Sequence, residues 1–524
     1  MIRRRSGCLP PIGKDTGSKA RGGCRLREDM KEKLEQQKQQ RIQNVHNTQE
    51  RQAEIQNVQK KLKGQEGTGR QKEQERKEKR SGNLTEGPIL RVLARLALPI
   101  MATSFLSTAY SITDMAWIGV LGSQAVAGVG VGGMYVWLSQ GLAALARMGG
   151  QVNVAQAVGR QREDLAREYS GAAVQMVLLF GLLFGSICLI FTNPLVGFFG
   201  VEDAVTVTYA KGYLKITCGL IVFSYVNYVL TGLFTARGDS ATPLKANVAG
   251  LVINMIFDPL LILGAGPFPR LEVVGAAVAT VGAQMVVTGV LVAHLLRHGK
   301  KQIPIFQRVK GSRYRAILRI GVPTAVQTSL YCMISMVLTR MVAVFGAGAV
   351  ATQRVGGQIE SVCWNTAEGF GAAMNAFVGQ NYGARKMERV KKGYRLAFFT
   401  VLLEGLAVTA AFVLFPEPLS RLFFHEAEVI QVAVDYLIIV GLSEAFMAVE
   451  LMAIGAISGF GNTRLCSIVS ASITALRIPL AMILSRTPLG LNGIWWALTI
   501  TSMTKGIVLH ITFWQQWRKR NAQM

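Results

Sequence analysis

The sequence predicts an all-α polytopic membrane protein, and three observations support this fold class. Half of the 524 residues are hydrophobic and the mean hydropathy is +0.31, which is unusual for a soluble basic protein of this size. Apolar segments long enough to cross a bilayer, about 20 residues each, follow one another from residue 89 onward. The second half of the chain repeats the pattern of the first. We therefore expect a multi-pass protein of the cell (plasma) membrane.

Residues 1–84 differ in character from the rest of the chain. Residues 1–83 hold 22 Lys and Arg against 11 Asp and Glu, with few apolar residues and no aromatic residue. The tetrapeptide Ile-Gln-Asn-Val occurs at 42–45 and again at 55–58, an interval that does not fit a coiled-coil heptad. We expect a basic, Gln/Lys/Glu-rich cytoplasmic tail that is disordered or forms a solvated single helix. Because aromatic side chains for base stacking are missing, no nucleic acid is expected as a partner.

Twelve apolar segments follow the tail, and each is expected to form one transmembrane helix. They cover residues 90–119, 123–147, 169–191, 205–235, 243–263, 274–296, 316–345, 350–377, 394–415, 429–457, 465–485 and 491–515.

The charges between these segments predict their orientation. One alternate set of loops carries 23 Lys and Arg, whereas the opposite set carries five. Cytoplasmic loops are the basic ones in membrane proteins, so both termini are expected in the cytoplasm. The loop over 297–319 has eight basic residues and no acidic one. We therefore divide the chain into an N-lobe (85–297, helices 1–6), a basic cytoplasmic linker (298–315) and a C-lobe (316–524, helices 7–12).

The two lobes are internal repeats. A shift of 224 residues aligns 95–162 with 319–386 without a gap and superimposes landmarks such as Pro99 on Pro323 and Gln156 on Gln380. Because each repeat has an even number of helices, both repeats have the same orientation in the membrane. We therefore expect two parallel six-helix repeats with a central cleft between them. Carriers bind their substrate between such halves and move one half against the other.

Asp114 is the most informative single residue. It is the one charged side chain between Leu96 and Ala146, and an ionised carboxylate there costs about 2.5–3.5 kcal/mol on insertion scales. Its repeat partner is Leu338, so the fold does not require an acid at this place. We expect Asp114 to bind a cation or carry a proton, although a hydrogen bond that holds a neighbouring helix is the alternative role.

A second polar group lies in the fifth segment. Asn254 and Asp258 are four residues apart and share one helix face, and Pro259 frees the carbonyl of Met255 because proline has no N–H. The predicted topology places Asp114, Asp258 and Thr280 at a similar depth. These residues are expected to line one pocket of the N-lobe, and a helix-packing role for Asn254 and Asp258 is the alternative.

The remaining charged residues and cysteines give no indication of a catalytic or metal site. Some of the buried C-lobe charges are expected to form internal ion pairs; the charges are Arg340, Glu360, Glu368, Glu404, Glu444, Glu450 and Arg477. The seven cysteines show no metal-site spacing, and the sequence has no HExxH, GxSxG or P-loop motif. We expect no enzyme activity, no cofactor and no metal site other than Na⁺ at Asp114, Asn254 and Asp258.

Several segments resemble one transporter family, the multidrug and toxic compound extrusion (MATE) transporters of bacterial type, over about residues 85–520. The similar motifs are Arg237-Gly-Asp-Ser-Ala-Thr-Pro243, Gly275-Ala-Ala-Val-Ala-Thr280, Gly379-Gln-Asn-Tyr-Gly-Ala-Arg385, Arg477-Ile-Pro-Leu480 and Gly490-Leu-Asn-Gly-Ile-Trp-Trp496. By this resemblance, a cation or proton site falls on Asp114, Asn254, Asp258 and Thr280. Members with a C-lobe site carry an acid on the seventh helix, and this sequence has none there.

The resemblance implies a secondary antiporter, acting as a monomer, that exports cationic or neutral amphipathic compounds in exchange for H⁺ or Na⁺. Tyr110, Trp117 and Tyr135 are candidates for binding the small-molecule substrate within the lipid bilayer. A flippase for lipids or lipid-linked oligosaccharides with a similar two-lobe architecture is the alternative. It is less favoured, because the N-lobe helices have almost no basic residues that would bind a polyanion.

Overall fold

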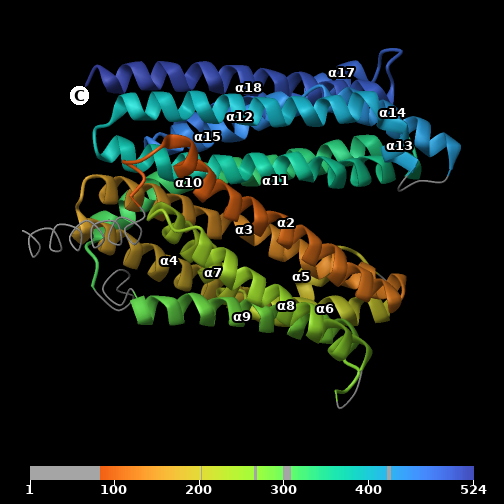
Figure 1. The fold of residues 1–524 in the computed structure, drawn as a ribbon. Coiled ribbons are helices and arrows are strands. Elements are labelled where there is room, and N and C mark those ends of the chain that lie inside the picture. Colours follow the sequence, from red (N-terminus) through yellow and green to blue (C-terminus); the bar gives the residue numbers. More distant parts are fainter. Residues whose placement is uncertain (1–82, 202, 265–267, 299–307, 422–425, 524) are drawn as a thin grey trace, which may run out of the picture. The chain divides into compact units, whose positions relative to one another are not determined.

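The computed structural model describes residues 83–201, 203–264, 268–298, 308–421 and 426–523, which belong to one compact unit beginning at Ser81. The predicted tail therefore lies outside the described residues, apart from its last two positions. The described part of the chain is helical and has no strand (Figure 1). This confirms the all-α prediction.

The helices of the first half fall on the predicted segments, although the helix predicted over 123–147 continues to Gly159 and the segment 205–235 is broken into two helices. They are α2 (Ile89–Val120), α3 (Ser123–Gly159), α4 (Glu163–Ile190), α5 (Thr192–Gly197), α6 (Ala204–Gly219), α7 (Val222–Ala236), α8 (Ala241–Leu263) and α9 (Glu272–His298).

The helices of the second half have the same order, except that two short helices over Thr463–Leu484 stand where the first half has the single helix α8. They are α10 (Gly311–Ala343), α11 (Ala347–Gly383), α12 (Met387–Leu414), α13 (Pro416–Arg421), α14 (Ala427–Gly441), α15 (Glu444–Gly459), α16 (Thr463–Ala475), α17 (Arg477–Leu484) and α18 (Leu491–Asn521).

Length and composition identify ten of the expected membrane spans. Eight pass as single helical stretches, and two more are the bent pairs α6–α7 and α14–α15, which bend by 45° and 47°. The two pairs occupy equivalent places in the repeats. α11 and α18 complete two sets of six; they are long enough, but polar side chains lower their hydropathy. The predicted twelve-helix architecture is thus present in the described residues.

The first helix of each set packs into the core of the other set. Leu93 of α2 is buried in a cluster formed with Phe377, Tyr394 and other residues of the second half. Its repeat partner, Ile317 of α10, is buried in the corresponding cluster of the first half. The two sets are therefore joined by a symmetric exchange of their first helices at the end where α2 begins. We call this the tail end.

Glycines allow the two sets to approach closely at the tail end. A Cβ added to Gly159 of α3 would lie 1.9 Å from the carbonyl oxygen of Gln380, and one added to Gly383 of α11 would lie 2.3 Å from that of Gln156. The same two glutamines cross between the sets. Gln156 Nε2 donates to the carbonyl of Gly459 at 2.9 Å, and Gln380 Nε2 donates to that of Ala236 at 2.8 Å.

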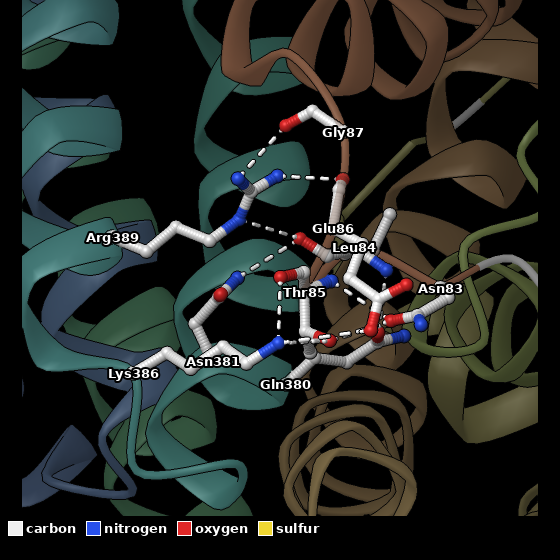
Figure 2. A network of polar contacts seen from close by, with 9 residues as sticks. All are labelled: Asn83, Leu84, Thr85, Glu86, Gly87, Gln380, Asn381, Lys386 and Arg389. Atoms are coloured by element: carbon white, nitrogen blue, oxygen red, sulfur yellow. Dashed lines mark hydrogen bonds and ion pairs between the residues drawn. The ribbon is translucent and has the colours of Figure 1, made fainter.

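A short segment before α2, residues 83–87, completes this closure, and we call it the strap (Figure 2). Its Leu84 N–H donates to Oε1 of Gln380 at 3.0 Å, and Asn381 Nδ2 donates to the Leu84 carbonyl at 3.2 Å. Arg389 donates to the carbonyls of Leu84, Glu86 and Gly87 at 3.3, 2.7 and 2.8 Å. The strap belongs to the first repeat, but these hydrogen bonds come from α11 and from residues around the start of α12 in the second repeat.

The opposite end of the helices shows different local chemistry. Gly122 and Gly346 precede α3 and α11 with φ of 101° and 102°, a conformation that favours glycine. Asp203 caps α6 and accepts from the hydroxyl of Thr206 at 2.5 Å and from its N–H at 2.8 Å. These two hydrogen bonds hold the pKa of Asp203 below the ordinary range of an aspartate. The contacts across the two sets described above lie near the tail end, which is therefore the closed end.

Candidate functional site

The predicted polar group of the N-lobe lies between α2 and α8. Asp114 is on α2, six residues before its end, and Asp258 is on α8, five residues before its end. Asn254 lies one turn before Asp258 on the same helix. The exposed fractions of these three residues are 8% for Asp114, 1% for Asn254 and 0% for Asp258.

The polar atoms of this group are only partly hydrogen bonded. Asn254 Nδ2 donates to Asp258 Oδ1 at 3.0 Å, as the four-residue spacing predicts. Three oxygens remain without a hydrogen-bond partner among the described residues: Asp114 Oδ1, Asn254 Oδ1 and Asp258 Oδ2. Leaving a buried polar atom unsatisfied costs about 1–3 kcal/mol, so three such atoms in one group require an explanation.

Tyr110 connects this group to α9. Its hydroxyl donates to Oγ1 of Thr280 at 2.9 Å, and it lies close enough to Asp114 and Asp258 to interact with them electrostatically. Tyr110 lies one turn before Asp114 on α2. Its hydrogen bond to Thr280 therefore links Thr280 to the edge of the polar group. Of the three predicted substrate-binding aromatics, Tyr110 is the one that contacts the polar group.

Tyr213 of α6 is a neighbour that the sequence did not suggest. It interacts electrostatically with both Asp114 and Asp258. A Cβ on Gly132 would lie 2.9 Å from its ring, so this glycine makes the room that the ring occupies. No local pattern marks Tyr213, since it lies in an ordinary apolar helix and reaches the site only through packing.

Apolar side chains enclose the site toward the ends of α2 and α8. Ile118 and Ile262 are buried together with Ala276 and Ala277 of α9. A small cavity of ≈ 50 Å³ continues from Tyr110 toward the tail end; Thr103, Leu106, Ser107, Tyr110, Asn247, Gly250, Leu251, Ala283, Gln284 and Val287 line it. The cavity therefore has both polar and apolar groups in its lining, from α2, α8 and α9.

The other two aromatic candidates are placed differently. Trp117 packs against the apolar cluster beside the site and lines a surface hollow with Thr113 and Val120. Tyr135 donates its hydroxyl to the carbonyl of Leu195 at 2.8 Å and packs edge-on against Phe199. The structure shows no contact between Tyr135 and the polar group.

The second repeat builds the equivalent place without acids. Leu338 is buried with Ile334, Val342 and Ala481 in an apolar cluster. Of the predicted C-lobe charges, Glu450 forms an internal ion pair, with Lys505 of α18 at 2.8 Å, a partner that the sequence did not suggest. Among the described residues, no cluster of three or more His, Cys, Asp or Glu could hold a metal ion.

Two other C-lobe charges, Arg477 and Glu360, use neutral partners. Arg477 donates to the hydroxyls of Thr501 and Ser502, at 2.8 Å each. The hydroxyl of Tyr436 donates to Glu360 Oε1 at 2.5 Å. These contacts tie helices of the second set together. Glu444 differs from them, because its Oε2 is buried and has no hydrogen-bond partner among the described residues.

Comparisons with known proteins agree along most of the chain. The MatE family matches residues 99–260 and 323–483, which is more than half of the length. The probable multidrug resistance protein NorM of Thermotoga maritima is 28% identical over 442 residues, which cover 82% of this chain and 94% of that protein. The FAD transporter of Shewanella oneidensis is 24% identical over 440 residues, which cover 82% and 95%.

Solved structures share the fold. A multidrug resistance MATE family transporter of the MOP superfamily, in an outward-facing conformation, aligns with a TM-score of 0.78 at 22% identity and covers 84% of this chain and 99% of its own. A mutant of the MATE transporter VcmN of Vibrio cholerae aligns with a TM-score of 0.76 at 20% identity, with coverage of 82% and 97%.

Proposed function

Because the chain belongs to the MatE family of transporters, we propose that it is an antiporter that exports cationic or neutral amphipathic compounds in exchange for H⁺ or Na⁺. Asp114, Asn254 and Asp258 are the coupling site in this proposal, and Thr280 supports it through Tyr110. The observation that carries the proposal is the set of three buried oxygens without hydrogen-bond partners on these residues.

The chemistry of the group suits a small hard cation or a proton. Carboxylate and amide oxygens are the donors that hard cations prefer. Asp114 and Asp258 interact electrostatically and are both buried, so binding a proton or Na⁺ relieves their mutual repulsion. The apolar cluster around Ile118 and Ile262 keeps the pair away from bulk water, which strengthens the effect of each bound charge.

The absence of this group from the second repeat supports a function rather than a packing role. Leu338, the repeat partner of Asp114, lies on the equivalent helix of the second repeat and is buried in an apolar cluster. The fold is thus stable at this position without a carboxylate. An ionised acid in a membrane costs several kcal/mol, and the second repeat has no acid at this place. Ion coupling best explains why the first repeat has Asp114.

Alternating access supplies the transport cycle. The tail end is closed by the strap, the crossing glutamines and the close approach at Gly159 and Gly383. We propose that this end faces the cytoplasm, in keeping with the basic loops, and that substrate enters when these contacts separate. Ion binding at Asp114 and Asp258 from the opposite side then favours release of the exported compound and return of the empty carrier.

Transport by purified protein in proteoliposomes tests the proposal. A fluorescent lipophilic cation is followed under an imposed pH gradient and, separately, under an imposed Na⁺ gradient. Wild type should transport under at least one gradient, and Asp114→Asn should fall to the level of empty vesicles under both while folding normally. Asp114→Asn that pumps at the wild-type rate would disprove the coupling site.

A further inference from the structure

Three cationic and two aromatic side chains line a surface groove between the start of α12 and the end of α18. They are Lys391 and Arg395 of α12, and Trp514, Trp517 and Arg518 of α18. The volume of the groove is ≈ 410 Å³. It lies at the tail end, where both helices pass from charged to apolar sequence.

The aromatic rings hold the cations in place. Lys391 Nζ lies 5.0 Å from the ring centre of Trp517, and Arg395 Cζ lies 5.6 Å from that of Trp514. The indole N–H of Trp517 donates to the carbonyl of Met387 at 3.0 Å, which fixes that ring against the start of α12. Cation–π contacts of this kind orient a charge without neutralising it, so the groove keeps its positive potential.

Little negative charge balances the groove. Glu388 approaches Lys391 at 3.7 Å, but its side chain is 67% exposed, so the pair is a weak surface contact. Within the described ranges, Arg395 and Arg518 form no ion pair. The groove therefore has cationic groups available for an anion from outside the chain.

An apolar stripe continues from the cations along both helices. Phe399 and Leu403 follow Arg395 at intervals of four residues on α12, and they are 66% and 72% exposed. Ile507 and Ile511 lie on the corresponding face of α18, both 49% exposed. In a membrane-spanning bundle such a stripe faces acyl chains, and tryptophans at its end mark the headgroup level.

We propose that this groove binds the phosphate headgroup of an anionic phospholipid, whose acyl chains lie along the stripe below it. Lys391, Arg395 and Arg518 contact the phosphate, and Trp514 and Trp517 pack against the glycerol region. Basic pockets at the headgroup level attract anionic lipids in this way. The adjoining apolar stripe favours a lipid over a soluble phosphate compound.

The test compares two lipids with the same acyl chains on the purified full chain in a neutral detergent. Native mass spectrometry counts the bound phosphatidylglycerol or phosphatidylcholine during a titration. Wild type should retain phosphatidylglycerol at concentrations at which phosphatidylcholine has dissociated. The variant K391Q/R395Q/R518Q should bind phosphatidylglycerol about 100-fold more weakly, since each basic residue near a membrane surface contributes about a fivefold factor.

A matched control removes three positive charges elsewhere. Lys392, Arg464 and Lys519 are exposed and do not line the groove; K392Q/R464Q/K519Q should bind as wild type does. Thermal melts by circular dichroism check that both variants are folded. Equal retention of the two lipids, or equal weakening by both triple variants, would overturn the proposal. Displacement of phosphatidylglycerol by inorganic phosphate alone would also overturn it, because it would show an anion site that needs no acyl chain.

Discussion

At the residue scale, single glycines determine how closely the two repeats approach. A Cβ at position 159 would overlap the carbonyl oxygen of Gln380, whereas a Cβ at Gly133 of the same helix would meet nothing within 4 Å. Both glycines belong to α3, Gly133 in its interior and Gly159 as its last residue, and they differ in this contact. The pair therefore separates the helix propensity of glycine from its role in the closed end.

We expect Gly159→Ala to destabilise the closed tail end by about 1–3 kcal/mol, the usual cost of overpacking. Gly133→Ala should be neutral or stabilise the protein by about 0.5–1 kcal/mol, because alanine is the better helix former. Thermal stability in detergent measures both effects. Labelling of a single cysteine at Met148, which contacts Asn375 at 3.5 Å across the repeats, measures opening. Similar behaviour of the two variants would show that the close approach does not control closure.

Asp258 is the second residue whose role can be separated from folding. Asp258→Asn keeps the size of the side chain and removes the charge that interacts with Asp114. We expect it to abolish gradient-driven transport and to leave the amount of folded protein unchanged. Glu404→Gln, a partly buried acid near Cys363 in the second set, is the control and should keep most activity. Equal loss in both variants would point to a general effect of buried acids.

At the element scale, the strap and the start of α12 form one unit. Arg389 donates to three strap carbonyls, and Lys386 Nζ donates to Oγ1 of Thr85 at 3.2 Å (Figure 2). Leu84 is buried in the core cluster of the second set. In the proposed transport cycle, α2 moves away from the second set when the tail end opens, and these bonds then break.

We expect Arg389→Gln to shift the equilibrium toward an open tail end by about 2 kcal/mol, or about 30-fold, because hydrogen bonds from charged donors are lost. Faster maleimide labelling at position 148 in a Cys-free background, applied from the tail side, measures the shift. Lys392→Gln, on the same helix and outside the strap network, should not change the rate. An unchanged rate in Arg389→Gln would show that the strap does not hold this end closed.

At the scale of the whole molecule, two truncations separate the tail from the strap. Deleting residues 1–82 leaves the strap in place, and we expect transport per molecule to stay near the wild-type level. Deleting residues 1–87 also removes the strap, and it should increase labelling at position 148 as Arg389→Gln does. A transport-dead but folded 1–82 truncation would show instead that the tail takes part in the cycle.

Orientation in the membrane is a second prediction at this scale. If the basic loops face the cytoplasm, a single cysteine at Arg486, between α17 and α18, should react with an impermeant maleimide on intact cells. A single cysteine at Ser312, at the start of α10, should react only after the cells are opened. The reverse pattern would contradict the proposed orientation and place the tail end outside.

The sequence alone determined the helical class, the repeat and the residues of the polar group. Hydropathy, the 224-residue shift and the lone charge at Asp114 are local or periodic signals, so they can be read without coordinates. The four-residue spacing of Asn254 and Asp258 likewise predicted that they share one helix face, and the structure shows them hydrogen bonded there. The linker remains a prediction: part of it lies outside the described residues, and α10 begins at Gly311.

Only the tertiary structure decided which distant residues meet. Leu84 and Gln380 are 296 positions apart, and nothing near either residue indicates that they are hydrogen bonded. Helix packing places Tyr213 close enough to Asp114 and Asp258 to interact with them electrostatically. It also directs the hydroxyl of Tyr135 to the carbonyl of Leu195 in α5. The physical reason is that hydropathy and spacing specify elements and faces, whereas contacts between faces depend on the packing of all helices at once.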